Sequence, residues 1–465
     1  GGAGLMARGK KKEAALSPAE RLQATLVPES EQPYKVPENW CWVSLQTIDQ
    51  YHSSSVDPSK YPSDLFELYS VPSSANDYPE IVRGDEIGST KQSVKKGDVL
   101  LCKINPRINR VWKVSQYTEN TLLASSEWII IRNSEINSDY LMYCFRAPYF
   151  REYMLSNVSG VGGSLMRAQP KYVKTYPVPI PPFSEQQRIV DRIESLFAKL
   201  DEAKQKAQDA LDSFETRKAA ILHKAFNGEL TALWRKEHGV GMESWKKSTV
   251  GQVCCDVKVG IVIKPSQYYT DKEKGTPAFR SANVRENHID NFDWVYLNHV
   301  GMENNSRSVV HTGDVLVVRS GNPGTACVVS EKFDGYNAID ILIAVPDHKQ
   351  ISSEFLCNYT NSPFGKTLIF ENKRGMALAH FNVKGYSELP ISVPQLDEQT
   401  EIVHILDDLL AKERQAKEAA EKVLEQIDLT KKAILARAFR GELGTNDPTE
   451  ESAVELLKKS FERGE

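Results

Sequence analysis

Basic and amide side chains gather in the stretch KINPRINRVWK, and side chains of these types can hydrogen-bond to the edges of nucleic-acid bases. Arginine binds guanine through two parallel hydrogen bonds, and asparagine or glutamine binds adenine in the same way. The local positive charge could also neutralise phosphates. A solvated turn has a similar composition, so that interpretation stays open. The candidate ligands of a nucleic acid in this stretch are Lys103, Asn105, Arg107, Asn109, Arg110 and Lys113.

Four further stretches carry similar side chains. The stretch GVGGSLMRAQPK is rich in glycine, which lets a backbone approach a ligand closely because no side chain intervenes. The other three lie in the second half of the chain: RSANVREN, VVRSGNPGT and ENKRGMALAHFNVK. The candidates are Arg167, Gln169 and Lys171 in the first half, and Arg280, Asn283, Arg285, Arg319, Asn322, Lys373, Arg374, His380, Asn382 and Lys384 in the second.

The motifs of the enzymes that such side chains could suggest are incomplete. The sequence INPRI lacks the second proline and the aromatic residue with which amino-methyltransferases hold a flipped base. In TNSPFGKT, Thr360 stands where a phosphate-binding loop needs its first glycine. Asp347 lies too far from Glu371 for a nuclease motif, and neither cysteines nor histidines have the spacing of metal ligands. We therefore expect a chain with no catalytic residues, no metal and no cofactor of its own.

Charge and hydropathy narrow the class of protein. The net charge is −4, so the chain as a whole does not have the basic character of a nucleic-acid-binding protein. No apolar run approaches the ~20 residues of a membrane span, and the N-terminal stretch lacks the apolar core of a secretion signal. We expect a cytoplasmic protein that does not enter a membrane. On its own it should bind nucleic acid weakly, because such affinity rests largely on neutralised phosphates.

The candidate ligands must be positioned by a framework that occurs twice in the chain. Residues 184–231 align with residues 397–444 without a gap, and roughly 40% of the positions are identical, far above chance for unrelated helices. Shorter similarities keep the same order in both halves: a tryptophan opening, a Gly-Asp-Val-Leu strand, a proline run with Glu-Gln, and an ending in Gly-Glu-Leu. Residues 51–94 and 256–308 share no pattern. The sequence thus predicts two globular domains with a common frame and different content, each followed by a long helix.

Both long segments have the periodicity of a coiled-coil helix, with apolar side chains three and four residues apart. Ser184 and Asp397 are the expected N-caps, and Gly228 and Gly441 the expected C′ glycines. A solitary helix of about 43 residues with an apolar stripe is unstable in water, so we expect the two to pair within one chain. The expected pairing residues are Ile189, Ile193, Leu196, Leu200, Phe214, Ile221, Ile402, Leu406, Leu409, Val423, Ile427 and Ile434.

Short elements are expected in the globular parts. The runs GDVLLCKI, SEWIIIR, GDVLVVR and DILIAV are typical of strands. The stretches SDYLMYCFRAPYFREYML and SEFLCNYTNSPFGKTLIF predict paired short helices that follow the last strand of each domain.

This order of motifs resembles the specificity subunit of type I restriction-modification enzymes. The resemblance rests on PIPPFSEQQRIV with AILHKAFNGEL in the first half, and on ISVPQLDEQTEIV with AILARAFRGEL in the second. The openings VPENWCWVSL and MESWKKSTV also match, and the resemblance extends from Ser17 to Glu465. Gln395 replaces the second proline of the motif, and Lys246, Lys247 and Ser248 replace a more apolar opening. These departures leave open how each head docks on its helix.

The resemblance implies a subunit that reads a bipartite sequence in double-stranded DNA, one globular domain per half-site, with the helices setting the gap between them. The implied partners are two adenine-N6 methyltransferase subunits that use S-adenosylmethionine, and two translocase-endonuclease subunits that use ATP and Mg²⁺. The open alternative is a coiled-coil interaction scaffold with two protein-binding heads. A nuclease or methyltransferase with a degenerate site is disfavoured by the missing motifs.

The expected fold class is α+β. Two α/β target recognition domains are each followed by a long helix, and the two helices pair as an antiparallel coiled coil with a pseudo-twofold, circular organisation. The expected segments are an N-terminal extension (1–33), the first recognition domain (34–183), the central helix (184–231), the second recognition domain (232–396), the C-terminal helix (397–444) and a tail (445–465).

Overall fold

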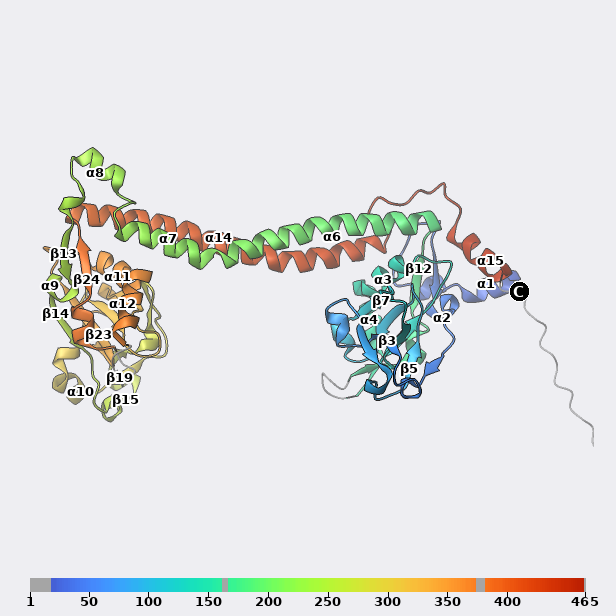
Figure 1. Cartoon of the computed structure of the whole chain (residues 1–465), viewed down its shortest axis with the longest axis horizontal. Coiled ribbons are helices and arrows are strands. Elements are labelled where there is room, and N and C mark those ends of the chain that lie inside the picture. The colour runs from blue at the N-terminus through green and yellow to red at the C-terminus, as the bar shows by residue number, and fades with distance from the viewer. Residues whose placement is uncertain (1–17, 161–165, 374–380, 464–465) are drawn as a thin grey trace, which may run out of the picture. The chain divides into compact units, whose positions relative to one another are not determined.

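The structure is a computed structural model that describes residues 18–160, 166–373 and 381–463. The chain divides into two compact units (Figure 1). Unit 1 takes its described residues from Gly1–Lys206 and Val423–Glu465, and unit 2 is Ala207–Lys422. Each unit combines a head of short strands and helices with segments of the long helices. No helix within these described ranges is long and apolar enough to cross a membrane.

The head of unit 1 is built on two sheets. An antiparallel sheet of three strands has β6 (Val99–Cys102) in the middle, with all four of its residues buried. A sheet of five strands has the order β2-β5-β8-β3-β4, in which β3 and β8 run parallel. Helix α3 packs on β6 and β7, and α4 follows it directly. The bounds are β1 Cys41–Ser44, β2 Ser55–Val56, β3 Leu65–Tyr69, β4 Glu80–Arg83, β5 Lys91–Ser93, β7 Val111–Lys113, β8 Thr121–Ala124, β9 Trp128–Ile131, β10 Val158–Ser159, β11 Arg167–Ala168, β12 Pro177–Ile180, α1 Pro18–Thr25, α2 Leu45–Ile48, α3 Ser138–Arg146, α4 Pro148–Ser156 and α5 Pro170–Val173.

The head of unit 2 repeats one of these sheets and replaces the other. A sheet in the order β14-β23-β20-β21 contains the second Gly-Asp-Val-Leu strand, β20 (Val315–Val318), which is again buried. A second sheet has the order β15-β19-β16-β22. Helix α11 packs on β20 and β21. The bounds are β13 Lys246–Thr249, β14 Cys254–Val259, β15 Tyr269–Thr270, β16 Thr276–Phe279, β17 Val284–Arg285, β18 His288–Ile289, β19 Val295–Leu297, β21 Ala326–Val328, β22 Asn337–Ala338, β23 Ile341–Pro346, β24 Pro390–Val393, α8 Ala232–His238, α9 Val250–Val253, α10 His299–Asn304, α11 Ser353–Asn361, α12 Pro363–Lys373 and α13 Val383–Ser387.

The repeated sequence motifs pair with one another inside each unit. The strand after the first tryptophan opening, β1, runs antiparallel to the proline-run strand β12. In unit 2, β13 and β24 pair in the same way. Gly97 and Gly313, which precede the two buried strands, both have φ +90°, a conformation that favours glycine. The predicted strands and the predicted pairs of short helices, α3 with α4 and α11 with α12, are confirmed. Their predicted place after the last strand of each head is wrong, because β12 and β24 come after the helix pairs and pair with β1 and β13.

The long helices differ in continuity. Helix α14 (Leu396–Ala438) is unbroken over 43 residues. The expected single helix of the first half is wrong, because it is divided at Ser213 into α6 (Phe183–Asp212) and α7 (Phe214–Phe226). The Ser213 hydroxyl donates a hydrogen bond of 2.7 Å to the carbonyl of Asp209, a contact that often bends helices.

The predicted glycine ends of the helices are confirmed, and the predicted N-caps are wrong. Gly228 and Gly441 have φ +85° and +74° beyond the last helical turns. The helices begin at Phe183 and Leu396, so Ser184 and Asp397 lie inside the first turn. The prolines before each start allow a helix to begin one residue earlier than the polar side chains suggest.

Within each unit, the contacts between the long helices show that the two helical segments run antiparallel. In unit 1, Lys431 Nζ lies 2.5 Å from Asp201 Oδ1, and Arg188, earlier in α6, donates to the carbonyl of Thr445, which follows α14, over 3.0 Å. In unit 2, Arg217 pairs with Glu413 at 2.9 Å, and Lys417 lies over the ring of Phe214. Each unit therefore contains an antiparallel pair of helical segments, and a coiled coil over the whole length remains a prediction.

The predicted apolar stripe is mostly buried, with one correction. Val423 is 42% exposed, so its assignment to the stripe is wrong. Ala420 and Ile427 are buried, and Leu424, which lies four residues beyond Ala420, takes the inner place in that turn. Ile189, Ile193, Phe214, Ile402, Leu406 and Ile427 are buried, and Leu196, Leu200, Ile221, Leu409 and Ile434 are half-buried.

Each head shares its core with helix ends from both copies of the repeat. In unit 1, Ile189 and Ile193 of α6 belong to the same apolar cluster as Leu435 and Ala438 of α14 and the strands β1 and β12. In unit 2, Leu222 and Ala225 of α7 join Ile402 and Leu406 of α14 beneath β24. Helices α1 and α15 (Ala453–Arg463) also lie side by side in unit 1 (Figure 1).

Candidate nucleic-acid interface

The two candidate loops of unit 1 are held together by backbone hydrogen bonds. The amide of Asn105 donates to the carbonyl of Met166 over 2.8 Å, and the amide of Ala168 donates to the carbonyl of Lys103 over 2.8 Å. Ile104 also forms a β-bridge with Arg167. The basic stretch after β6 and the strand β11 therefore form one surface, although more than 60 residues separate them in the sequence.

The basic stretch is a tight loop with unusual backbone conformations. It contains a short 3-10 helix, η5 (Pro106–Ile108), flanked by Asn105 with φ +45° and Asn109 with φ +52°. Asparagine tolerates this left-handed region better than most residues, but the conformation still costs about 1–3 kcal/mol unless surrounding contacts maintain it. Arg146 provides one such contact, because its carbonyl accepts a hydrogen bond of 3.4 Å from Asn109 Nδ2. Its Nη2 also donates to the carbonyl of Val111 over 2.8 Å. The Arg151 guanidinium donates to the carbonyl of Arg107.

The candidate side chains of this surface differ in how free they are. Arg107 is exposed. Lys113 forms an ion pair with Asp139 at the start of α3, so it helps to dock that helix on β7. Arg167 pairs with Glu127 at 2.7 Å but keeps 52% of its side chain exposed.

The other candidates of unit 1 differ in exposure. Lys103 is half-buried, and Gln169 precedes the first turn of α5. Lys171 is exposed and lies 4.6 Å from the centre of the Tyr172 ring. Asn109 and Arg110 both line a pocket next to η5.

Several candidates of unit 2 make structural contacts instead of presenting free side chains. Asn283 is fully buried, and its amide binds the backbone at Arg280 and Phe292, so it does not reach the surface. Arg285 forms an ion pair of 2.9 Å with Asp290. The sequence could not show this, because composition does not reveal which carboxylate or carbonyl a side chain meets.

Arg280 and Arg319 are also held by carboxylates. Arg280 Nη2 lies 2.6 Å from Asp293 Oδ2. Arg319 Nη1 lies 3.1 Å from Asp340 Oδ1, and its side chain is only 15% exposed.

The remaining candidates of unit 2 include two exposed side chains. Asn322 is exposed in the turn after β20, and Lys384 is 81% exposed on α13. Asn382 caps α13, with its Oδ1 accepting a hydrogen bond from the amide of Gly385 over 2.8 Å. Lys373 is the last residue of α12, and its side chain lies outside the described set. Arg374 and His380 lie outside the described residues.

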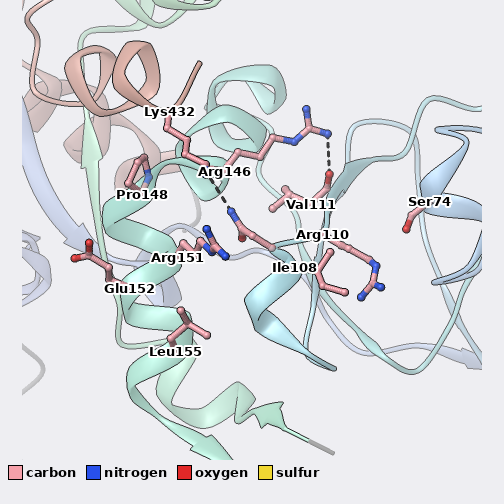
Figure 2. Close-up of a pocket in the computed structure, with 11 residues that line it drawn as sticks. Ser74, Ile108, Arg110, Val111, Arg146, Pro148, Arg151, Glu152, Leu155 and Lys432 are labelled. Carbon is pink, nitrogen blue, oxygen red and sulfur yellow. Dashed lines mark hydrogen bonds between the residues drawn. The ribbon is translucent and has the colours of Figure 1, made fainter. Parts of the chain in front are cut away.

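A pocket of about 670 Å³ opens beside η5 in unit 1, between α4 and the C-terminal part of α14 (Figure 2). Four of the side chains that line it are cationic: Arg110, Arg146, Arg151 and Lys432. Glu152 is its one acidic lining residue. Burial lowers the pKa of the Arg146 guanidinium from its ordinary value.

A second kind of site, which the candidate list missed, fastens each head to a long helix. The indole Nε1 of Trp40 donates to Glu185 Oε2 over 2.7 Å, and Trp245 Nε1 donates to Glu398 Oε2 over 3.0 Å. The next residue in each copy is a glutamine with an equivalent contact. Gln186 accepts a hydrogen bond from the backbone amide before α3, and Gln399 accepts one from the backbone amide before α11. The recurrence of tryptophan and Glu-Gln in both halves was the sequence signal for this site.

The same glutamates receive the end of the other copy of the repeat. Thr231 Oγ1 donates to Glu398 Oε1 over 2.7 Å, and Thr445 Oγ1 donates to Glu185 Oε1 over 3.2 Å. Each head is thus closed by the beginning of one repeat copy and the end of the other. This exchange explains why the phrase ending in Gly-Glu-Leu occurs twice.

Among the described residues, no group of three or more histidine, cysteine, aspartate or glutamate side chains could hold a metal ion. All seven cysteines are free thiols, of which only Cys255 is exposed.

Comparison with known proteins places the chain in a family. The model of the type I restriction modification DNA specificity domain matches residues 65–211 and again residues 242–426. The specificity subunit of the type I restriction enzyme EcoKI from Escherichia coli K12 is 26% identical over 341 residues, which cover 70% of this chain and 71% of that protein.

Two solved structures have the same fold. The HsdS subunit from Thermoanaerobacter tengcongensis covers 89% of this chain and all of its own, with a TM-score of 0.65 and 22% identity. A structure from work on complex assembly and conformational transition of the type I restriction-modification system covers 88% of this chain and all of its own, with a TM-score of 0.67 and 22% identity.

The frame that occurs twice, with a DNA specificity domain matched in each half, defines a DNA-recognition protein of the α+β class. The chain belongs to the family of type I restriction-modification specificity subunits. The resemblance identified from the motifs is therefore confirmed.

Proposed function

We propose that this chain reads a bipartite sequence in double-stranded DNA, with one head for each half-site. The observation that carries this proposal is the contrast between frame and content. Both heads contain an equivalent strand pair, an equivalent buried strand and an equivalent helix pair. The sheets β2-β5-β8-β3-β4 of unit 1 and β15-β19-β16-β22 of unit 2, by contrast, differ in number and order of strands. Two unlike recognition surfaces on one common frame suit two unlike half-sites.

The recognition itself rests on side chains and backbone at the loops. In unit 1, Arg107 is exposed on a loop whose backbone accepts hydrogen bonds from Arg146 and Arg151. A rigid loop loses little conformational entropy when it binds, which favours accurate reading of base edges. In unit 2, Asn322 and Lys384 are the exposed candidates among the described residues.

The chain acts in a complex and has no catalytic residues of its own. Its partners in the cytoplasm are two adenine-N6 methyltransferase subunits that use S-adenosylmethionine, and two translocase-endonuclease subunits that use ATP and Mg²⁺. Support for partners comes from the solved structure related to assembly of a type I system. The net charge of −4 adds to this support, because subunits with more cations are needed to neutralise DNA phosphates.

Methylation mapping tests the proposal. The full chain is expressed with the methyltransferase subunit encoded beside it, and host DNA is sequenced for N6-methyladenine. We expect one split motif, in which two short half-sites flank a fixed gap. If the two proteins form a complex and no new motif arises, the chain is instead an interaction scaffold whose heads bind proteins.

A further inference from the structure

The pocket beside η5 carries an excess of positive charge. Arg110 comes from the basic loop, Arg146 and Arg151 come from α3 and α4, and Lys432 comes from α14 (Figure 2). Among the lining residues one carboxylate, Glu152, opposes these four cations, and Asp77, which does not line the pocket, also attracts Arg146. All of these residues belong to unit 1, so the pocket lies within one compact unit.

The chain itself offers these arginines few partners. Arg146 and Arg151 each donate to one backbone carbonyl of the loop, which leaves most of their donors unused. The Nε of Arg151 is buried and has no hydrogen-bond partner in the part of the chain that the structure describes. Among the described residues, Arg110, Arg146 and Arg151 form no ion pair within 4 Å, and the Asp77 carboxylate attracts Arg146 only from a longer distance. A partly buried guanidinium without a counter-anion is unfavourable, so binding an anion here gains free energy.

The corresponding junction of unit 2 contains an anion from the chain. Helix α12 begins with Pro363 as α4 begins with Pro148, and Lys366 holds the position of Arg151, three residues further on. Lys366 and Lys218 of α7 both form ion pairs with Glu286. In unit 2, the cation at this helix position therefore has an anionic partner within the chain, Glu286.

The residues that line the pocket of unit 1 indicate that an anion bound there comes from DNA. Asn109 and Arg110 line it, and both belong to the loop that the proposed function assigns to base reading. A duplex whose base edges meet this loop carries a phosphate every few ångströms along each strand. Guanidinium groups bind phosphate through parallel hydrogen bonds, and a lysine adds a point charge.

We propose that the pocket formed by Arg110, Arg146, Arg151 and Lys432 binds one backbone phosphate of the DNA, independently of base sequence. The proposal rests on the function proposed above and adds to it a contact where the head meets α14. It fixes the position of the duplex relative to the reading loop. Arg151 has two parts in this pocket, since it holds both the loop and the phosphate.

Two exposed residues of opposite charge allow a test that does not disturb the fold. Lys432→Gln removes a cation, and Glu152→Gln removes the opposing carboxylate. DNA binding is measured by fluorescence anisotropy over a range of salt concentrations, with the full chain in complex with its methyltransferase subunits. One duplex carries the mapped motif, and in a second duplex both half-sites are scrambled. Lys422→Gln, at another exposed lysine of α14 that does not line the pocket, is the matched control.

Opposite effects are expected from the two variants. Lys432→Gln should weaken binding of both duplexes by the same factor, roughly threefold to tenfold, and reduce the slope of log K against log salt by about 1. Glu152→Gln should strengthen binding of both duplexes by a similar factor, and the control should leave both affinities unchanged. Subunit assembly, followed by size-exclusion chromatography, should be the same for all variants.

Three results would overturn the phosphate assignment. Unchanged affinities in both variants would show that the pocket does not contact DNA. A loss confined to the motif duplex would indicate a base contact, and loss of subunit assembly would indicate a carboxylate of a partner protein. Because the wild-type complex is measured in parallel, its failure to distinguish the two duplexes would count against the proposed function and not against this pocket.

Discussion

At the scale of single residues, two glutamates have the most demanding positions in the molecule. Glu185 is fully buried and accepts hydrogen bonds from Trp40, Thr445 and Asn446. Glu398 is 1% exposed and holds Trp245, Thr231 and Arg235. Buried carboxylates are stable only when they are fully hydrogen-bonded or paired. These glutamates therefore fasten head, helix start and helix end in one contact.

Neutralising the two glutamates should have unequal effects. Glu185→Gln keeps the size of the side chain and loses charge-assisted hydrogen bonds, which should cost about 1–2 kcal/mol of unfolding free energy. Glu398→Gln also leaves the buried Arg235 without its counter-ion and should cost about 3–5 kcal/mol. Chemical denaturation of the full chain measures both losses, with Glu421→Gln on the exposed face of α14 as the control. Equal losses in the two variants would contradict the role given to the ion pair.

Glu286 makes the stability of unit 2 depend on pH. Burial by itself raises the pKa of this carboxyl, but hydrogen bonds from Lys218 and Lys366 outweigh it, so the pKa lies below its ordinary value of 4.5. A depressed pKa contributes stability that is fully present above pH 4.5 and is lost as the pH falls through the lower folded value.

Glu286→Gln should therefore destabilise unit 2 at neutral pH, by about 1 kcal/mol for a partly exposed network. It should also flatten the loss of stability below pH 4.5. Hydrogen exchange of the amides around β17 and β18 measures this locally. Glu273→Gln, an exposed glutamate of the same unit, should keep the wild-type pH dependence. An unchanged acid profile in Glu286→Gln would refute the assignment.

At the scale of elements, the long helices combine two kinds of packing. Near each head, the apolar stripe enters the core of the head, as Ile189 and Ile402 show. Further along, contacts are made between the helices themselves, as Lys431 shows with Asp201 and Phe197. The apolar stripe therefore packs against a head over part of its length and against the other long helix over the rest. Tertiary packing decides which residues of the stripe are buried.

The corrected register of α14 gives a direct comparison of two substitutions. Ile427→Ala removes a side chain that is 3% exposed and should cost about 2–4 kcal/mol. Val423→Ala acts on a side chain that is 42% exposed and should cost less than about 0.5 kcal/mol. Thermal unfolding of both variants, monitored by circular dichroism at 222 nm, checks the difference. A larger loss for Val423→Ala would restore the register expected from the sequence.

At the scale of the whole molecule, the same frame of strands and helices occurs in two heads whose remaining parts differ. The shared parts are the strand pairs β1-β12 and β13-β24, the buried strands β6 and β20, and the helix pairs α3-α4 and α11-α12. The parts that differ are the sheets β2-β5-β8-β3-β4 and β15-β19-β16-β22, and the loops. If each head reads one half-site, a substitution in one head should alter recognition of one half of the target and leave the other half unchanged.

Arg107→Gln and Asn322→Ala should each relax one half of the methylated motif and leave the other half intact. If the side chain contacts a base, the cost should be about 1–3 kcal/mol at a single position. Methylation mapping of each variant, in complex with the methyltransferase subunit, gives the result. A variant that alters both halves at once would contradict the assignment of one head to one half-site.

Much of the architecture followed from local patterns. The Gly-Asp-Val-Leu strands, the helix pairs and the glycine ends of the long helices are confirmed, because periodicity and glycine conformation act over a few residues. The candidate site was less predictable. Asn283 and Arg319 have the right side chains for base reading, yet both are engaged inside the head by partners that their local sequence does not reveal.

The sequence by itself determined that the molecule has two similar halves with different content, because identical residues at a fixed spacing are visible without coordinates. Only the tertiary structure decided that each half is completed by the other copy of the repeat, as Thr231 with Glu398 and Thr445 with Glu185 demonstrate. It also decided that Arg110, Arg146, Arg151 and Lys432 share one pocket. Such contacts join residues far apart in the chain, and the physical reason is that burial and hydrogen-bond geometry are set only when the whole unit packs.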